Sequence, residues 1–599
     1  MSAIPLSERL LGWVFARINR RRPWYTMPTA KLQIANLVGL RGQMRQKNLY
    51  DTYRRRVTDS APIPEEFQKV RTSDGSYNDP RDSSVGQAGT RFGRNVPLSQ
   101  ARPASDQDML TPDPREISNR LLARQTFLPA SSINVLAAAW LQFMVHDWFG
   151  HGKNLKHNPI KVEIDPDDGW HERPMRVPRT QFAPHEDEPT RAPRDAYRNV
   201  MTHWWDGSQI YGSSQAEQDA MRQFEDGLVR IKDDGHLELD ADGIELSGLN
   251  DNWWLGLSLL HTLFHREHNA ICRELKSAYP DRDDEWLFQT ARLINAALLA
   301  KIHTIEWTPA LLDTPALWGA MRGNWWGILG EGIHRRYGRV SKNEVLSGIM
   351  GSDLNHHAVP FAMTEEFVAV YRMHPLIPDR FSMRRRADDA TITELSLKDI
   401  AARNTHGVYH QASFEDSLYS LGTEPPGAIC LGNYPNELRR FTRQDDGDTV
   451  DIASIDVIRD RERGVPRYNQ FRRLLGMPPM TSIETLTSDH HWRRELNEIY
   501  DGDIEKVDPM IGMYAEAPPP GFAFSDTAFR IFILMASRRL KSDRFFTSDY
   551  RPGVYTPEGM AWVTNNDFKD VIIRHCPSLA SAIEGIRNPF FPWRKGRSA

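Results

Sequence analysis

The stretch that decides the fold is Phe367-Val-Ala-Val-Tyr371-Arg-Met-His374-Pro375-Leu376. Two glutamates stand just before it, where carboxylates stabilise the positive end of a helix dipole. Apolar residues then follow at helical spacing, and Pro375 predicts the end of the helix. Tyr371 and His374 are three residues apart, so on a helix both side chains would lie on one face as neighbours. Taken alone, the pair is also compatible with a tyrosine and a histidine that serve only the core.

Composition predicts a globular protein with a large core. The chain has 599 residues, 40% of them hydrophobic and 10% aromatic. Its formal net charge is −4 and it has no strongly basic domain, which excludes a typical nucleic-acid-binding protein. The three cysteines stand far apart, which predicts no disulfide framework and favours a reducing compartment. No apolar run approaches the roughly 18 to 20 residues of a membrane span, and no signal peptide is evident. We therefore expect a cytoplasmic protein.

The N-terminal segment differs from the rest in charge. Residues 1–60 carry twelve Lys or Arg against three Asp or Glu, and their apolar residues recur at helical spacing. Basic amphipathic helices of this kind either pack on the main body or lie against anionic lipid, so residues 1–25 are a candidate peripheral membrane contact. Residues 61–115 are rich in Pro, Ser, Asp, Gly and Arg, which predicts a long irregular connecting loop before a main domain at 116–599.

A second strong helix is predicted over Ser131–Phe149, with a serine cap at its start. Gln142 and His146 are four residues apart and would share one face of this helix. A neutral imidazole can take a proton from a bound hydroperoxide and return it to the leaving oxygen. His146 and His151 are badly spaced for two metal ligands on one helix face, and the sequence has no HExxH motif.

A turn with alternating oxygen donors follows at Thr202-His-Trp204-Trp-Asp206-Gly-Ser208. Side-chain and backbone oxygens in such a turn suit a hard cation such as calcium, although a hydrogen-bonded turn is the commoner explanation. Asp147, next to His146 on the predicted helix, would point to a different neighbour and could close the site. This coupling is what favours the calcium hypothesis.

These motifs, together with Leu263-Phe-His-Arg-Glu-His-Asn269, resemble the peroxidase–cyclooxygenase superfamily of haem proteins. Further segments resemble one branch of it, the fatty acid α-dioxygenases: Lys301–Thr308, Arg459–Asn469 and Ala536–Phe546. The similarity runs in order from about residue 30 to 585. The resemblance implies a mainly α protein, with a single large haem-peroxidase-type helical domain, long irregular loops and an N-terminal helical extension. Residues 116–599 would then be the catalytic domain.

Carried over residue by residue, the resemblance makes His374 the proximal iron ligand of a non-covalent haem b. His146 would be the distal histidine, and Gln142 the second polar group on that side. Tyr371 would bear a radical. The calcium ligands implied are Asp147, Thr202, Trp204, Asp206 and Ser208.

The same resemblance places a substrate carboxylate against His303, Thr308 and Arg539, with Arg538 as the alternative to Arg539. Judged without it, each of these residues would more readily be explained by local structural contacts. A fatty acid held in this way would present its Cα to Tyr371. The implied substrates are therefore a fatty acid and O2, with a hydroperoxide as activator.

The implied product is a 2-hydroperoxy fatty acid, which can lose CO2 to give a shortened aldehyde. The alternatives are a haem peroxidase, a dioxygenase acting further along the acyl chain, and a non-catalytic haem-binding or membrane-surface scaffold.

Overall fold

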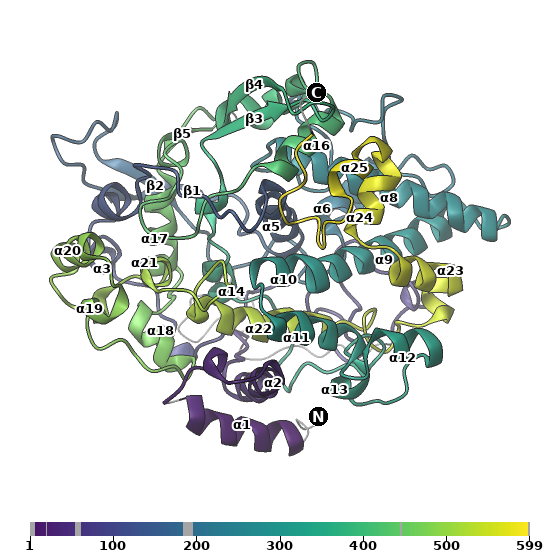
Figure 1. The fold of residues 1–599 in the computed structure, drawn as a ribbon, viewed down its shortest axis with the longest axis horizontal. Helices are drawn as coiled ribbons and strands as arrows, with labels where there is room; N and C mark the ends of the chain where they lie inside the picture. Colours follow the sequence, from purple (N-terminus) through teal and green to yellow (C-terminus); the bar gives the residue numbers. More distant parts are fainter. Residues whose placement is uncertain (1–5, 20, 54–61, 184–195, 444–445, 597–599) are drawn as a thin grey trace.

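Long helices form the body of the molecule (Figure 1). The computed structural model describes residues 6–19, 21–53, 62–183, 196–443 and 446–596. The helices of eight or more residues are α1 Leu6–Asn19, α2 Ala30–Lys47, α5 Val135–Trp148, α8 Leu255–Ala278, α9 Asp284–Ile302, α11 Pro315–Trp326, α12 Gly330–Tyr337, α16 Phe414–Thr423, α17 Ile452–Glu462, α20 His490–Ile499, α22 Asp526–Lys541, α23 Pro552–Asn565 and α24 Phe568–His575.

Short helices and peripheral hairpins connect these elements. The shorter helices are α3 Asp106–Met109, α4 Pro114–Ile117, α6 Ser208–Tyr211, α7 Gln215–Met221, α10 Thr308–Leu311, α13 Glu344–Ser347, α14 Glu365–Val370, α15 Thr405–Val408, α18 Tyr468–Leu474, α19 Ile483–Leu486, α21 Pro509–Ala515 and α25 Ala580–Ile583. The antiparallel strand pairs are β1 Leu155–Val162 with β2 Met175–Arg179, β3 Arg380–Arg384 with β4 Thr391–Ser396, and β5 Phe441–Thr442 with β6 Thr449–Val450. The predicted mainly α architecture with long irregular loops is confirmed.

Helix α5 lies in the centre of the molecule and packs against α8, which in turn packs against α9. It is apolar nearly all round, as expected of a helix enclosed on every side. Its cap differs from the predicted serine: the side chain of Asn134 accepts from the Ala137 N–H, and its amide donates to the carbonyls of Pro589 and Phe591. The capping residue therefore also holds the C-terminal segment in place. Such a long-range contact cannot be inferred from capping preferences, which are local.

Helix α14 is shorter than predicted, and this corrects the expected relation of Tyr371 to His374. The helix ends at Val370, Tyr371 is its C-cap with φ −88° and ψ 5°, and His374 begins a separate 3₁₀ turn, His374–Leu376. The two side chains therefore do not share one helix face. Pro375 has no N–H to donate to the carbonyl of Tyr371, four residues back, and its ring would clash with that carbonyl, so the helix cannot continue through Tyr371 to His374.

The N-terminal helices lie at one edge of the body, at the bottom of Figure 1. Helix α1 packs along α2, and Trp24 anchors the segment by donating from Nε1 to Asp526 of α22 at 2.8 Å. Leu10 and Trp13 on α1 stay 62% and 56% exposed. Residues 62–115 are largely irregular, with a few short turns. Among the described helices, none is long and apolar enough to cross a membrane.

Candidate active site

Tyr371 is enclosed by aromatic rings. The centroid of its ring lies 4.5 Å from that of Phe367, 5.5 Å from Trp148 and 5.8 Å from Phe532. Its hydroxyl oxygen is buried and has no hydrogen-bond partner among the described residues. Burial raises the pKa of Tyr371, so the phenol keeps its proton at any physiological pH. The side chain is thus a buried, protonated phenol whose O–H is available to a ligand.

Arg539 lies on α22 with all three guanidinium nitrogens buried and no hydrogen-bond partner for any of them in the described part of the chain. The guanidinium carbon sits 3.7 Å from the ring centroid of Trp148 and 5.0 Å from that of Trp205. Burial lowers the pKa of Arg539 to about 9. A buried cation is normally paired, so an unpaired one marks a site for an anion.

The adjacent Arg538 is already engaged. Its Nη2 donates to the carbonyl oxygens of Val359 at 2.7 Å and Pro360 at 3.0 Å. Of the two candidates from the sequence, Arg539 is therefore the one with hydrogen-bonding capacity left for a ligand.

His303 lies in a π-helical turn, His303–Trp307, which follows α9 directly. Such a turn inserts an extra residue into the helix, and it occurs often at functional sites. The Nε1–H of Trp140 donates to Nδ1 of His303 at 3.2 Å, so the neutral ring carries its own proton on Nε2. Burial and the charge of Arg539 lower the pKa of His303, and Nε2 is buried without a partner. The imidazole therefore offers a free N–H donor.

Thr308 is buried as well, but its hydroxyl already donates to the carbonyl oxygen of His303 at 2.8 Å. Its predicted contact with a carboxylate stays a prediction, since no free hydroxyl proton remains in this arrangement. Trp148, which sequence reasoning did not single out, is the neighbour that these side chains share. Its ring contacts Arg539, lies 5.1 Å from the ring of His303, and packs on Tyr371. The only sequence signal for it was its position directly after Asp147.

His374 presents one face outward. Its side chain is 35% exposed, and its Nδ1 lies 2.7 Å from Oδ2 of Asp456 on α17. Burial would raise the pKa of Asp456, but the charges of His374 and Arg372 outweigh burial and lower it to about 2. With a carboxylate at Nδ1, Nε2 is the nitrogen left to bind a metal. Asp456 was missed because it lies 82 residues further along the chain.

On the predicted distal side, His146 and Gln142 lie one turn apart on α5. Burial lowers the pKa of His146 to about 4, so the imidazole is neutral, and its Nδ1 has no hydrogen-bond partner in the residues described. Gln142 is held in place: Oε1 accepts from Trp254 at 2.8 Å, and Nε2 donates to the carbonyl of Asn252 at 3.2 Å. His151 instead contacts Glu365 at 3.0 Å, so it does not pair with His146.

These residues fit a haem. A histidine whose Nδ1 faces a carboxylate and whose ring is partly open is the arrangement of a proximal iron ligand. A neutral buried histidine with an unpartnered nitrogen suits the opposite side.

The residues of the predicted calcium turn come together. Asp147 Oδ1 accepts from the Ser208 N–H at 2.6 Å and from its Oγ at 3.0 Å, while Oδ2 of Asp147 is buried without a partner among described atoms. Thr202 Oγ1 donates to Asp206 at 2.9 Å. Burial and the nearby Asp206 raise the pKa of Asp147. One cation is already present, since Arg292 lies 3.3 Å from Asp206.

Trp204, the remaining predicted calcium ligand, is fully buried in the same turn. Its indole Nε1 donates to the carbonyl of Gly75 at 2.7 Å. The side chain is thus fixed by the loop of residues 62–115, and the predicted calcium contact concerns only the Trp204 carbonyl oxygen.

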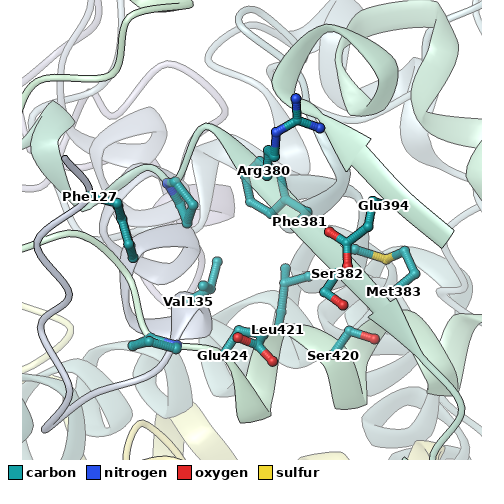
Figure 2. A pocket seen from close by; sticks show the side chains of 12 residues that line it. Phe127, Val135, Arg380, Phe381, Ser382, Met383, Glu394, Ser420, Leu421 and Glu424 are labelled. Atoms are coloured by element: carbon teal, nitrogen blue, oxygen red, sulfur yellow. The ribbon is translucent and has the colours of Figure 1, made fainter. Parts of the chain in front are cut away.

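A separate cavity of about 200 Å³ lies between the start of α5, strand β3 and α16 (Figure 2). Val135, Phe381 and Leu421 give it an apolar side, and Glu394 and Glu424 give it polar groups. None of the predicted site residues lines it.

The model of the animal haem peroxidase family matches residues 70–586. Alpha-dioxygenase 2 of Arabidopsis thaliana is 38% identical over 99% of this chain and 94% of its own length. Alpha-dioxygenase PIOX of Oryza sativa subsp. japonica is also 38% identical, over 97% of this chain and 95% of its own length. The crystal structure of fatty acid alpha-dioxygenase from Arabidopsis thaliana superposes with a TM-score of 0.91 at 35% identity, covering 98% of this chain and 93% of that one.

The crystal structure of a tyrosine-to-phenylalanine variant of the Oryza sativa fatty acid alpha-dioxygenase with palmitic acid superposes with a TM-score of 0.90 at 35% identity, covering 98% of this chain and 97% of that one.

The chain belongs to the animal haem peroxidase family, in its α-dioxygenase branch. Its cofactor is haem, and it is an oxidoreductase.

Proposed function

We propose that this protein is a fatty acid α-dioxygenase that converts a fatty acid and O2 into a 2-hydroperoxy fatty acid. The observation that carries the proposal is the set of unpaired polar groups around Trp148: the guanidinium of Arg539, Nε2–H of His303 and the hydroxyl of Tyr371. A cation, a donor and a phenol left without described partners around one buried side chain are what a carboxylic acid with a reactive Cα requires.

The carboxylate binds to Arg539 and His303. A guanidinium can form two parallel charge-assisted hydrogen bonds with a carboxylate, and His303 supplies a further donor from Nε2. The bound carboxylate acts as the counter-ion of the buried Arg539 guanidinium, and their attraction offsets the cost of keeping this cation out of water. A carboxylate accepts hydrogen bonds and needs donors, so Thr308 would join the site only by turning its hydroxyl proton from the His303 carbonyl to the ligand.

The position of the carboxylate selects the carbon that reacts. With the acid head fixed beside Trp148, the first methylene is the group presented to the Tyr371 oxygen. Haem, when bound, supplies the one-electron oxidation that converts Tyr371 to its radical, with a hydroperoxide as activator. The radical takes a hydrogen atom from Cα, O2 adds to the carbon radical, and the peroxyl group takes a hydrogen atom back from Tyr371. The product can lose CO2 to give an aldehyde one carbon shorter.

On the haem sides, we assign His374 as the proximal ligand, oriented through Nδ1 by Asp456. His146 and Gln142 form the distal side, where a neutral imidazole can accept the proton of a hydroperoxide. Gln142 is fixed by Trp254, so it offers an amide of set orientation. We expect the haem to be non-covalent.

Calcium would bind between Asp147 and the 202–208 turn. The proposal is supported by two buried carboxylates close together, one of which, Asp147, has an oxygen without a described partner. Thr202, Asp206, Ser208 and the carbonyl of Trp204 supply further oxygens of the kind calcium prefers.

For the N-terminal segment we propose a peripheral membrane contact in an otherwise cytoplasmic protein. Leu10, Trp13 and Val14 are exposed at i, i+3 and i+4 on α1, and Arg17 lies over the Trp13 ring at 4.2 Å. Apolar and basic side chains on one short helix suit an anionic bilayer surface. Flotation with anionic liposomes, comparing the full chain with one lacking residues 1–25, tests the idea. Equal flotation of both would reject it.

The decisive test of the function is oxygen uptake with palmitate, followed by mass spectrometry of the product. We expect a C2 hydroperoxide or the C15 aldehyde from the natural chain. Tyr371→Phe should abolish uptake while leaving haem content and peroxide-driven dye oxidation in place. Tyr555→Phe is the matched control, since it removes another buried hydroxyl, one that donates to the Phe545 carbonyl at 2.9 Å.

Three outcomes would contradict the proposal. Oxygen uptake by Tyr371→Phe would refute the radical assignment. A product oxygenated further along the chain would identify a different dioxygenase, and dye oxidation without any fatty acid oxygenation would identify a peroxidase.

A further inference from the structure

Three potential metal ligands from separate segments meet at a place that none of the sites described above includes. His236 lies in the loop after α7, Glu245 forms an isolated bridge with Leu239, and His406 lies on the short helix α15. One ligand atom from each of the three side chains lies within 4.8 Å of the other two. Two imidazoles and a carboxylate at this separation are a set that divalent transition metals bind.

One polar atom of each of the three side chains lacks a hydrogen-bond partner in the described structure. Glu245 is only 1% exposed, and its Oε1 makes no hydrogen bond, whereas Oε2 accepts from Trp253 Nε1 at 2.8 Å. The Nδ1 atoms of His236 and His406 are likewise buried without a described partner. His406 Nδ1 lies 3.9 Å from Glu245 Oε1, which is too long for a hydrogen bond. Buried polar atoms are nearly always paired, so three that converge point to a missing central atom.

We propose that His236, Glu245 and His406 bind one divalent transition-metal ion of the zinc class, separate from the haem and from the calcium proposed above. Bonds of about 2.0 to 2.2 Å to a tetrahedral ion bring ligand atoms to roughly 3.4 Å from one another, so small side-chain rotations suffice to close the site. Three protein ligands leave a fourth position for water. His236 and His406 are half-buried, which leaves a path for the ion from solvent.

The charges around the site are compatible with a bound cation. Arg266 of α8 is the nearby positive group, and its Nε is engaged by the carbonyl of Gly235 at 2.9 Å. Asp234 and Glu245 add negative charge.

The ion would join three segments. Ala402, at the start of the 3₁₀ turn before α15, donates its N–H to the carbonyl of Trp253 at 2.8 Å, and Trp253 also bonds Glu245. Trp254, the next residue, holds Gln142. A metal at this position would therefore clamp the 231–250 loop and α15 onto the segment that orients Gln142. We infer a structural role for the ion, with an open position that also admits a small ligand.

The experiment uses the untagged, haem-loaded full chain, stripped of loose metal with a chelator and then titrated with Zn2+ by calorimetry. Metal retained after gel filtration is counted by mass spectrometry. We expect one Zn2+ per chain and a rise in melting temperature on binding. Glu245→Gln keeps an acceptor for Trp253 but removes the charge, and His406→Asn removes one imidazole at a half-buried position.

Each variant should weaken zinc binding by at least about 100-fold, more than the 10- to 100-fold typical of losing an outer partner. His491→Asn, at an exposed histidine beside His490, is the matched control and should bind like the natural chain. Unchanged binding in Glu245→Gln and His406→Asn, or loss of binding in His491→Asn, would overturn the proposal. Failure of the natural chain to retain zinc would do the same. If Glu245→Gln does not fold, His406→Asn decides.

Discussion

Replacing Arg539 by methionine is expected to change substrate binding and protein stability in opposite directions. Methionine is uncharged and flexible and follows the first part of the arginine chain, so it removes the unpaired cation but ends short of the guanidinium position. Fatty acid binding should suffer, because the carboxylate loses its charged partner. The fatty-acid-free protein should gain stability, because in that state the guanidinium is buried with no hydrogen-bond partner among the described residues.

The structure gives the size of both effects. Truncating one partner of a buried, hydrogen-bonded charge pair costs about 2 to 5 kcal/mol, so KM for palmitate should rise roughly 30- to several-thousand-fold. Burial that lowers the pKa of Arg539 to about 9 corresponds to a cost of about 4 to 5 kcal/mol for holding the charge. The contact at 3.7 Å with the Trp148 ring returns about 2 kcal/mol. The difference, about 2 kcal/mol, is the upper limit of the expected gain in stability, because the shorter methionine leaves a cavity that lowers it.

The assay compares KM for palmitate with calorimetric melting of the haem-loaded, fatty-acid-free enzyme. Arg538→Met is the matched control. Its side chain donates to the carbonyls of Val359 and Pro360, so its loss leaves acceptors unpaired and should lower the melting temperature without changing KM. Binding of hexadecanol, which lacks the carboxylate, should be similar in all three proteins.

Two results would refute this reasoning. A normal KM in Arg539→Met would show that another group binds the carboxylate. A fall in melting temperature as large as that of Arg538→Met would show that Arg539 is structurally paired in the free enzyme.

Three further predictions concern other groups of the site. Because the pKa of Arg539 in the free enzyme is about 9, a rise in pH through that value neutralises the guanidinium. The kcat/KM for palmitate should therefore fall about tenfold per pH unit above pH 9. A kcat/KM that stays constant up to pH 10.5 would contradict Arg539 as the carboxylate-binding residue. Asp456→Asn removes the carboxylate at Nδ1 of His374, so haem affinity measured by Soret titration should fall about 10- to 100-fold, and unchanged affinity would argue against His374 as the ligand. Removing calcium with a chelator should lower the melting temperature of the natural chain but not that of Asp147→Asn, which lacks one carboxylate of the buried pair Asp147 and Asp206. The same change in melting temperature in both proteins would reject the calcium site.

The sequence by itself determined which catalytic residue types the chain offers and on which helices they lie. Helix α5 and helix α8 follow from apolar residues at helical spacing, because 3.6-residue periodicity is a local property of the chain. Gln142 and His146 share a face for the same reason. The set of candidate residues came from motifs in their order along the chain, and that order was enough to indicate the family later found in the comparisons.

Tertiary structure alone decided how these residues meet. It places Asp456 against His374 and brings Trp148 into contact with both Arg539 and Tyr371. It also gives the adjacent residues Arg538 and Arg539 different environments. Backbone carbonyls from a distant loop accept from the guanidinium of Arg538, whereas that of Arg539 has no described hydrogen-bond partner. Such contacts join segments tens to hundreds of residues apart. They depend on burial and pairing, which local sequence does not specify.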